Sequence, residues 1–112
     1  HDDRYAQAHE YMEVCYKLWE GSWADDAAVR DAAGGTFTDP SRVRPIRHEG
    51  AHYRVEGIHL CDTSPQRTPL LYQAGTSTAG RAFAGAHAEC VFVSGPSAAV
   101  IRRRTAELRA AV

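Results

Sequence analysis

The sequence predicts an α/β fold organised around a pair of parallel strands, and three observations support this prediction. Two short apolar runs, at residues 70–73 and 90–93, end in Gly and Ser turn residues, as buried strands do. An Ala-rich segment at 81–89 between them favours a helix. Because a strand, helix and strand joined by short connections form a right-handed crossover, the two strands are expected to be parallel.

The N-terminal third is predicted to be helical, over residues 1–33. Asp2 and Asp3 suit the first turn of a helix that Gly21 and Ser22 end. Residues 23–30 are expected to add one or two turns before Gly34 and Gly35. The apolar side of the long helix is predicted to carry Tyr5, Ala8, Met12, Cys15, Tyr16 and Trp19.

The middle of the chain, residues 34–68, reads as an inserted excursion rich in Pro, Gly, His and Arg. Short β-type runs at 43–47 and 52–55 flank Glu49 and Gly50 and predict a small hairpin. Residues 62–68 form a turn-rich approach to the first parallel strand. Residues 69–112 then provide two βα units, the last helix having Ala98, Ile101, Thr105, Leu108 and Val112 on one side.

Two strands cannot complete a parallel sheet, because such a sheet needs neighbours at its edges and cover on both faces. We therefore expect the missing strands to lie outside these 112 residues. The sequence starts at His1 without Met and enters a helix almost at once, which also suggests an interior section of a longer protein.

Composition excludes several functional classes. A formal net charge of −1 provides no basic field for nucleic acid or anionic lipid. The three cysteines form neither a disulfide framework nor a zinc knuckle, so a reduced, cytoplasmic location is expected. No apolar run is long enough to span a bilayer, and no signal peptide is evident.

A candidate phosphate site follows the first apolar run. Gly75, Thr76, Ser77 and Thr78 stand between strand and helix, where hydroxyl side chains and free backbone N–H groups converge at the positive end of a helix dipole. The same pattern also occurs as a plain connector in α/β proteins. Tyr5, near the start of the first helix, is either a core aromatic or a donor to an anion.

A second motif, His48-Glu49-Gly50-Ala51-His52, matches the zinc-binding pattern H-E-x-x-H. That mechanism requires a helix to bring both imidazoles to one face, whereas Gly50 and the flanking β-type runs indicate a hairpin. We therefore predict no metal site here, and a zinc peptidase remains the minor alternative.

Taken together, these stretches resemble the bacterial-luciferase-like flavin monooxygenases, in the branch of the nitrilotriacetate, dibenzothiophene-sulfone and long-chain-alkane enzymes. The matching segments are spread over nearly the whole chain in the family's order. They are residues 1–5, 10–23, 39–40, 48–50, 65–67, 73–77 with Gly80, and 87–89.

The resemblance implies an interior section of a (β/α)8 TIM barrel of several hundred residues, with about three to four helices and one insertion. It implies reduced FMN (FMNH2), a separate NAD(P)H:flavin reductase, and O2 activated as a flavin C4a-peroxide that oxidises a small organic substrate. A homo-oligomer is also implied. The catalytic and substrate-selecting residues are unknown, and the section alone is expected to be inactive.

By motif, Tyr5 and the loop Gly75, Thr76 and Ser77 are similar to the family's FMN phosphate contacts. Thr76 departs from the family's commoner Gly-Ser-Ser but keeps a hydroxyl. The alternative from another class is a non-catalytic α/β interaction module without a cofactor.

Overall fold

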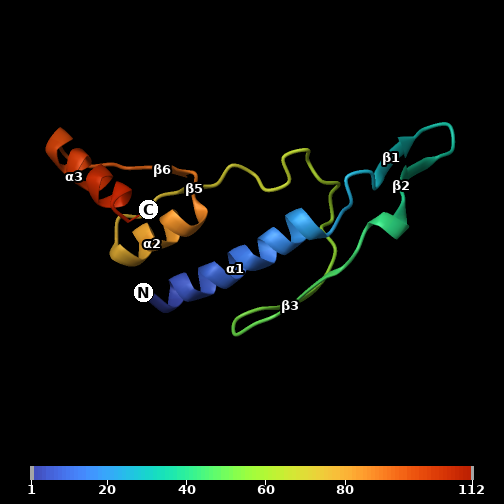
Figure 1. Ribbon diagram of the computed structural model, residues 1–112, viewed down its shortest axis with the longest axis horizontal. Coiled ribbons are helices and arrows are strands. Elements are labelled where there is room, and N and C mark those ends of the chain that lie inside the picture. The colour runs from blue at the N-terminus through green and yellow to red at the C-terminus, as the bar shows by residue number, and fades with distance from the viewer. Residues whose placement is uncertain (1, 112) are drawn as a thin grey trace. The chain divides into compact units, whose positions relative to one another are not determined.

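The computed structural model describes residues 2–111, and Figure 1 follows them from blue at the N-terminus to red at the C-terminus. His1 and Val112, both included in the sequence predictions, lie outside the described residues. The elements are α1 (Asp2–Gly21), β1 (Ala28–Asp31), β2 (Thr36–Thr38), the 3-10 helix η1 (Pro40–Arg42), β3 (Ile46–Glu49), β4 (Arg54–Gly57), β5 (Tyr72–Gln73), α2 (Thr78–His87), β6 (Cys90–Val91) and α3 (Ala98–Arg109).

The chain divides into two compact units. The terminal unit contains the residues up to His9 and those from Leu70 on, and the central unit is Glu10–Pro69. Helix α1 contributes its first turns to the terminal unit and the rest to the central unit.

In the terminal unit, β5 and β6 pair in parallel, with Tyr72 opposite Cys90 and Gln73 opposite Val91. This confirms the predicted parallel pair. Both strands are shorter than predicted, because the described ladder has two strands and each is paired along one edge. Among the described residues of this unit, the buried apolar side chains are Ala84 of α2 and Leu108 of α3.

Helix α2 begins three residues earlier than the predicted start at Arg81. Ser77 is its N-cap, and the side-chain oxygen of Ser77 accepts a hydrogen bond from the Gly80 backbone N–H. This confirms that the hydroxyl-rich loop begins the helix. Because the cap satisfies one of the free N–H groups, the first turn forms although it contains Gly80.

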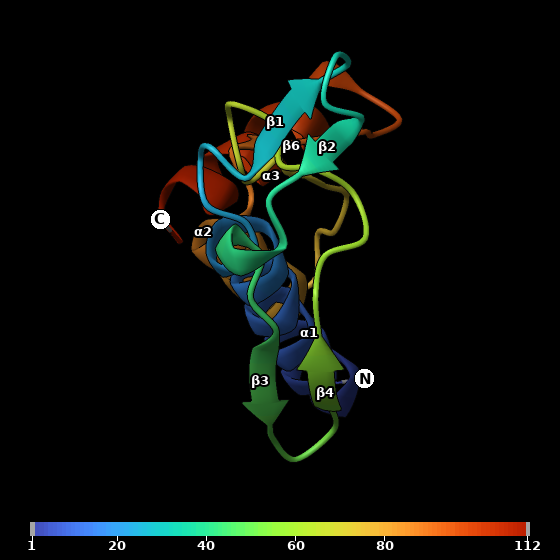
Figure 2. The same cartoon turned by 90° about the vertical axis from the view of Figure 1, so that its right-hand side faces the viewer.

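In the central unit, β3 and β4 form the predicted hairpin (Figure 2), with Ile46 opposite Gly57 and Glu49 opposite Arg54. The strand β3 alternates buried and exposed residues, and Ile46 and His48 are the buried ones. The period of two explains why a short polar sequence holds its register.

The predicted extension of the helix over residues 23–30 is wrong. Trp23 instead forms an isolated antiparallel bridge with Val43, and residues 28–31 form β1, which pairs with β2. The backbone N–H of Ala24 donates to Arg42 O at 3.0 Å, so this segment bonds across the unit and not to its own preceding turn. Long-range backbone pairing therefore outweighs local helix propensity here.

The described structure is thus α/β, with three α-helices and three two-stranded sheets, and residues 2–111 contain no closed barrel. Within the same residues, no helix combines the length and the apolar character needed to cross a membrane.

Candidate functional site

The loop between β5 and α2 places a helix N-terminus next to small and hydroxylated residues. Helix α2 has ten residues, and its first free N–H groups follow Ser77 directly. Ser77 uses an oxygen lone pair to accept from Gly80 N at 3.0 Å, which leaves its own hydroxyl hydrogen available for another acceptor. Thr76 is exposed beside it. The arrangement concentrates donors and the positive end of a helix dipole.

The Tyr5 hydroxyl lies against two glycines of this loop and helix. A Cβ added to Gly80 would stand 2.6 Å from Tyr5 Oη, and one added to Gly75 would stand 3.2 Å from the same atom. The Tyr5 ring packs on Phe83 of α2, with 5.6 Å between ring centroids. The absence of side chains at Gly75 and Gly80 therefore lets the tyrosine hydroxyl approach the start of α2.

Three of the four predicted site residues, Tyr5, Gly75 and Ser77, consequently come together. Thr76 belongs to the same loop, and its backbone oxygen accepts a hydrogen bond from Arg81 Nη1 at 2.6 Å.

Sequence reasoning missed Arg81. Its guanidinium spans from Thr76 O to the Glu107 carboxylate of α3, where the N–O distance is 3.3 Å. The available signal was the position of Arg81 in the first turn of a helix that follows the loop of Gly75, Thr76 and Ser77. Arg81 thus fixes the loop to the helix and brings one positive charge to it.

Gln73 was also missed, although it belongs to the quoted Gln73–Ser77 motif. Its side-chain oxygen Oε1 is buried and has no hydrogen-bond partner among residues 2–111. Its nitrogen Nε2 lies 2.7 Å from the position of a Gly75 Cβ. The carboxamide therefore rests on the bare backbone of Gly75, at the side of the loop that Tyr5 also faces.

The H-E-x-x-H motif lies in the β3–β4 hairpin and not on a helix. His48 Nε2 is 3.1 Å from Glu10 Oε1, and His48 Nδ1 is 3.1 Å from Lys17 Nζ. Since an ammonium only donates, Nδ1 accepts and Nε2–H donates to Glu10. The residues described here, 2–111, hold no cluster of three or more His, Cys, Asp or Glu suited to a metal ion.

Glu10 ties the hairpin turn to α1. Its carboxylate accepts from the backbone N–H groups of His52 at 2.9 Å and Tyr53 at 2.7 Å. Burial alone would raise the pKa of Glu10, but the bonds from Tyr53, His48 and His52 outweigh it and lower the pKa below its ordinary value of 4.5. The motif thus has a structural role in the central unit.

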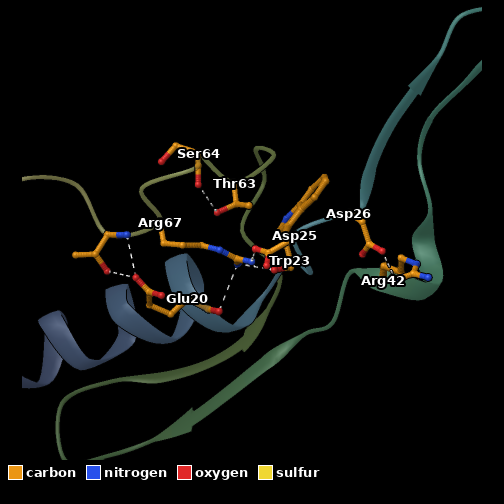
Figure 3. A network of polar contacts seen from close by, with 9 residues as sticks. Glu20, Trp23, Asp25, Asp26, Arg42, Thr63, Ser64 and Arg67 are labelled. Atoms are coloured by element: carbon orange, nitrogen blue, oxygen red, sulfur yellow. Dashed lines mark hydrogen bonds and ion pairs between the residues drawn. The ribbon is translucent and has the colours of Figure 1, made fainter.

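Arg67 organises a second polar network in the central unit (Figure 3). Its Nη1 donates to Trp23 O at 2.5 Å, and its Nη2 pairs with the Asp25 carboxylate. Glu20, in the last turn of α1, accepts from the Thr68 backbone N–H at 2.9 Å. Arg67 has a φ of 65°, so this bonding holds a non-glycine residue in the left-handed region. The network attaches the segment before β5 to the end of α1.

Comparison with known proteins gives a consistent result over the whole chain. The family described as luciferase-like monooxygenases matches residues 1–112. The chain is 60% identical over 95 residues to the long-chain alkane monooxygenase of Geobacillus thermodenitrificans (strain NG80-2), covering 85% of this chain and 22% of the relative. It is 53% identical over 109 residues to the dimethyl-sulfide monooxygenase of Hyphomicrobium sulfonivorans, covering 97% of this chain and 23% of the relative.

Two solved structures are similar in fold. The crystal structure of a long-chain alkane monooxygenase matches with a TM-score of 0.86 and 52% identity, over 99% of this chain and 26% of that one. A riboflavin lyase crystallised with modified FMN and riboflavin matches with a TM-score of 0.84 and 45% identity, over 99% and 25%. The chain therefore spans about a quarter of the length of the proteins it matches.

Proposed function

Since this chain belongs to the family of luciferase-like monooxygenases, we propose that it is a section of a two-component monooxygenase that uses reduced FMN and O2. A separate NAD(P)H:flavin reductase supplies the reduced flavin, and the substrate is a small organic molecule. The complete enzyme is a homo-oligomer of (β/α)8 barrels, in which β5–α2 and β6–α3 are two βα units. The central unit contains the insertion.

The observation that carries this proposal is the convergence of Tyr5, Gly75, Ser77 and Gly80 at the start of α2. In such barrels, phosphate groups bind at loops that follow the C-terminal ends of strands and lead into helix N-termini. The residues present fit such a group, because a Cβ at Gly75 or Gly80 would intrude on the Tyr5 hydroxyl and crowd the loop.

The side chains of the loop either donate to the phosphate or hold the loop in place. The hydroxyls of Tyr5, Thr76 and Ser77 donate to phosphate oxygens, together with the backbone N–H groups of the first turn of α2. Arg81 holds the loop through Thr76 O and adds positive charge. When bound, reduced FMN supplies the electrons that activate O2 for oxidation of the substrate. This section binds and orients the cofactor's phosphate.

The test is a flavin titration of the protein expressed from its complete reading frame. Hydrogen bonds to a charged group are worth roughly 1.5–3 kcal/mol each, so the double variant Thr76→Ala/Ser77→Ala should lose at least about tenfold in FMN affinity per bond. The matched control is Ser97→Ala, which removes the N-cap of α3, where Ser97 Oγ accepts from Val100 N at 3.4 Å. Unchanged FMN affinity in the double variant would remove the proposed site.

A further inference from the structure

No group in the described part of the chain donates a hydrogen bond to the carboxamide oxygen of Gln73. This oxygen, Oε1, is buried, and buried side-chain oxygens in folded proteins generally have a hydrogen-bond partner. Gln73 is the last residue of β5, directly before the loop that leads to α2. An unsatisfied acceptor at the edge of a binding loop points to a group that the bound ligand supplies.

The neighbours of Gln73 explain why its carboxamide stays beside the loop between β5 and α2. The carboxamide lies on Gly75, with Nε2 2.7 Å from where a Cβ would be, and the Tyr5 hydroxyl lies over the same glycine. Gln73 O also accepts from Phe92 N at 2.9 Å, which fixes the backbone of the residue against the segment that follows β6. The side chain is thus held beside the loop that we assign to the phosphate.

The tail of FMN offers two kinds of partner. An ionised phosphate presents oxygens that accept hydrogen bonds, and it gains nothing from a second acceptor. The hydroxyls of the ribityl chain can donate. From this chemistry we infer that Gln73 Oε1 accepts a hydrogen bond from a ribityl hydroxyl next to the phosphate. This inference rests on the proposed function, and it makes Gln73 a residue that recognises the sugar-alcohol part of the cofactor.

The experiment compares three flavins that differ in the tail: FMN, riboflavin, which lacks the phosphate, and lumiflavin, which lacks the ribityl chain. Each is titrated into the protein from its complete reading frame, with quenching of flavin fluorescence as the readout. Gln73→Met removes the acceptor and keeps the length of the side chain. The affinity for FMN and for riboflavin should fall by the same factor, roughly threefold to tenfold, and the affinity for lumiflavin should not change.

The matched control is Gln7→Met, the same substitution at an exposed position of α1, which should leave all three affinities unchanged. Two results would overturn the inference. A loss confined to FMN would mean that the amide contacts the phosphate, and no loss for FMN would mean that Oε1 is satisfied by water. Failure of the unaltered protein to bind riboflavin would also count against it, because the tail hydroxyls would then contribute no measurable affinity.

A second variant, Gln73→Glu, protects the test against a folding defect. It keeps the shape and the acceptor but adds a negative charge beside the phosphate, so FMN affinity should fall while riboflavin affinity is retained. Equal losses for both flavins would contradict the assignment. The two proposals fail differently: an unaffected Thr76→Ala/Ser77→Ala variant removes the phosphate site itself, whereas an unaffected Gln73→Met variant removes the ribityl contact alone.

Discussion

Replacing Gly80 by Ala tests whether the Tyr5 hydroxyl occupies the space above α2. In a helix, Ala is favoured over Gly by about 1 kcal/mol, so the substitution alone should stabilise the protein. The new Cβ would, however, lie 2.6 Å from Tyr5 Oη and 3.0 Å from Ser77 Oγ. Overpacking of this kind costs about 1–3 kcal/mol. The expected net effect is a loss of between about 0 and 2 kcal/mol in the free energy of unfolding.

The clash with Tyr5 can be isolated with a double-mutant cycle. Tyr5→Phe removes Oη, so Gly80→Ala in that background should be nearly neutral or stabilising, and the coupling energy should be about 1–3 kcal/mol. Urea unfolding of the flavin-free protein and its three variants measures these values. If Gly80→Ala changes the free energy of unfolding by the same amount in both backgrounds, the tyrosine hydroxyl does not lie over Gly80 and the geometric reasoning fails.

Two further predictions concern the central unit. Because the folded-state pKa of Glu10 is lowered, its contribution to stability is present above the ordinary value of 4.5 and is lost as the pH falls towards the folded value. Glu10→Gln should therefore reduce stability at neutral pH and flatten the decline in stability as the pH falls below 4.5. Urea unfolding at a series of pH values measures both effects, and parallel declines for the variant and the unaltered protein would contradict the prediction. Trp23→Phe removes the indole N–H that donates to His59 O at 2.8 Å, so unfolding should become about 1–3 kcal/mol more favourable. The same substitution at Trp19, which is less buried, is the control and should cost less.

Much of the terminal unit follows from local sequence signals. The apolar runs, the Ser77 cap and the order of strand, helix and strand each depend on neighbouring residues, and the structure contains all three. The same holds for the β3–β4 hairpin, which the short β-type runs around Glu49 and Gly50 already indicated. Where the signal for an element lies in neighbouring residues, the sequence pattern was sufficient to predict that element.

The predicted helical turns at 23–30 show where local signals were not sufficient. Trp23 is buried, and two contacts hold it in place: its indole N–H donates to His59 O, and its backbone pairs with Val43. Both partners are distant in sequence. Propensity within a window of residues carries no information about such partners. Arg67 is a second example. Its guanidinium donates to the backbone oxygens of Trp23 and Glu20 at the end of α1, which lie 44 and 47 residues earlier in the chain.

The candidate site was predicted in outline because its residues follow one another in the chain, and Tyr5 joined it through the resemblance. Arg81 and Gln73 were missed for different physical reasons. The importance of Arg81 arises from contacts to Thr76 O and Glu107, and the second of these lies on another helix. Gln73 stands out because no group among the described residues donates a hydrogen bond to its Oε1, and no sequence pattern reveals this.

The position of Arg81 bears on how the site would attract an anion. Its charge is shared with Glu107, whose carboxylate lies 3.3 Å from Nη1, and the same nitrogen also serves the Thr76 carbonyl. The guanidinium is therefore engaged in holding the loop, and its field is partly cancelled by the carboxylate. In the proposed function, a phosphate would therefore be held mainly by the hydroxyls of Tyr5, Thr76 and Ser77 and by the N–H groups of α2. A site of that kind would select its ligand by the geometry of its donors more than by net charge. A Cβ at Gly80 or Gly75 would disturb this geometry, because it would lie 2.6 Å or 3.2 Å from Tyr5 Oη.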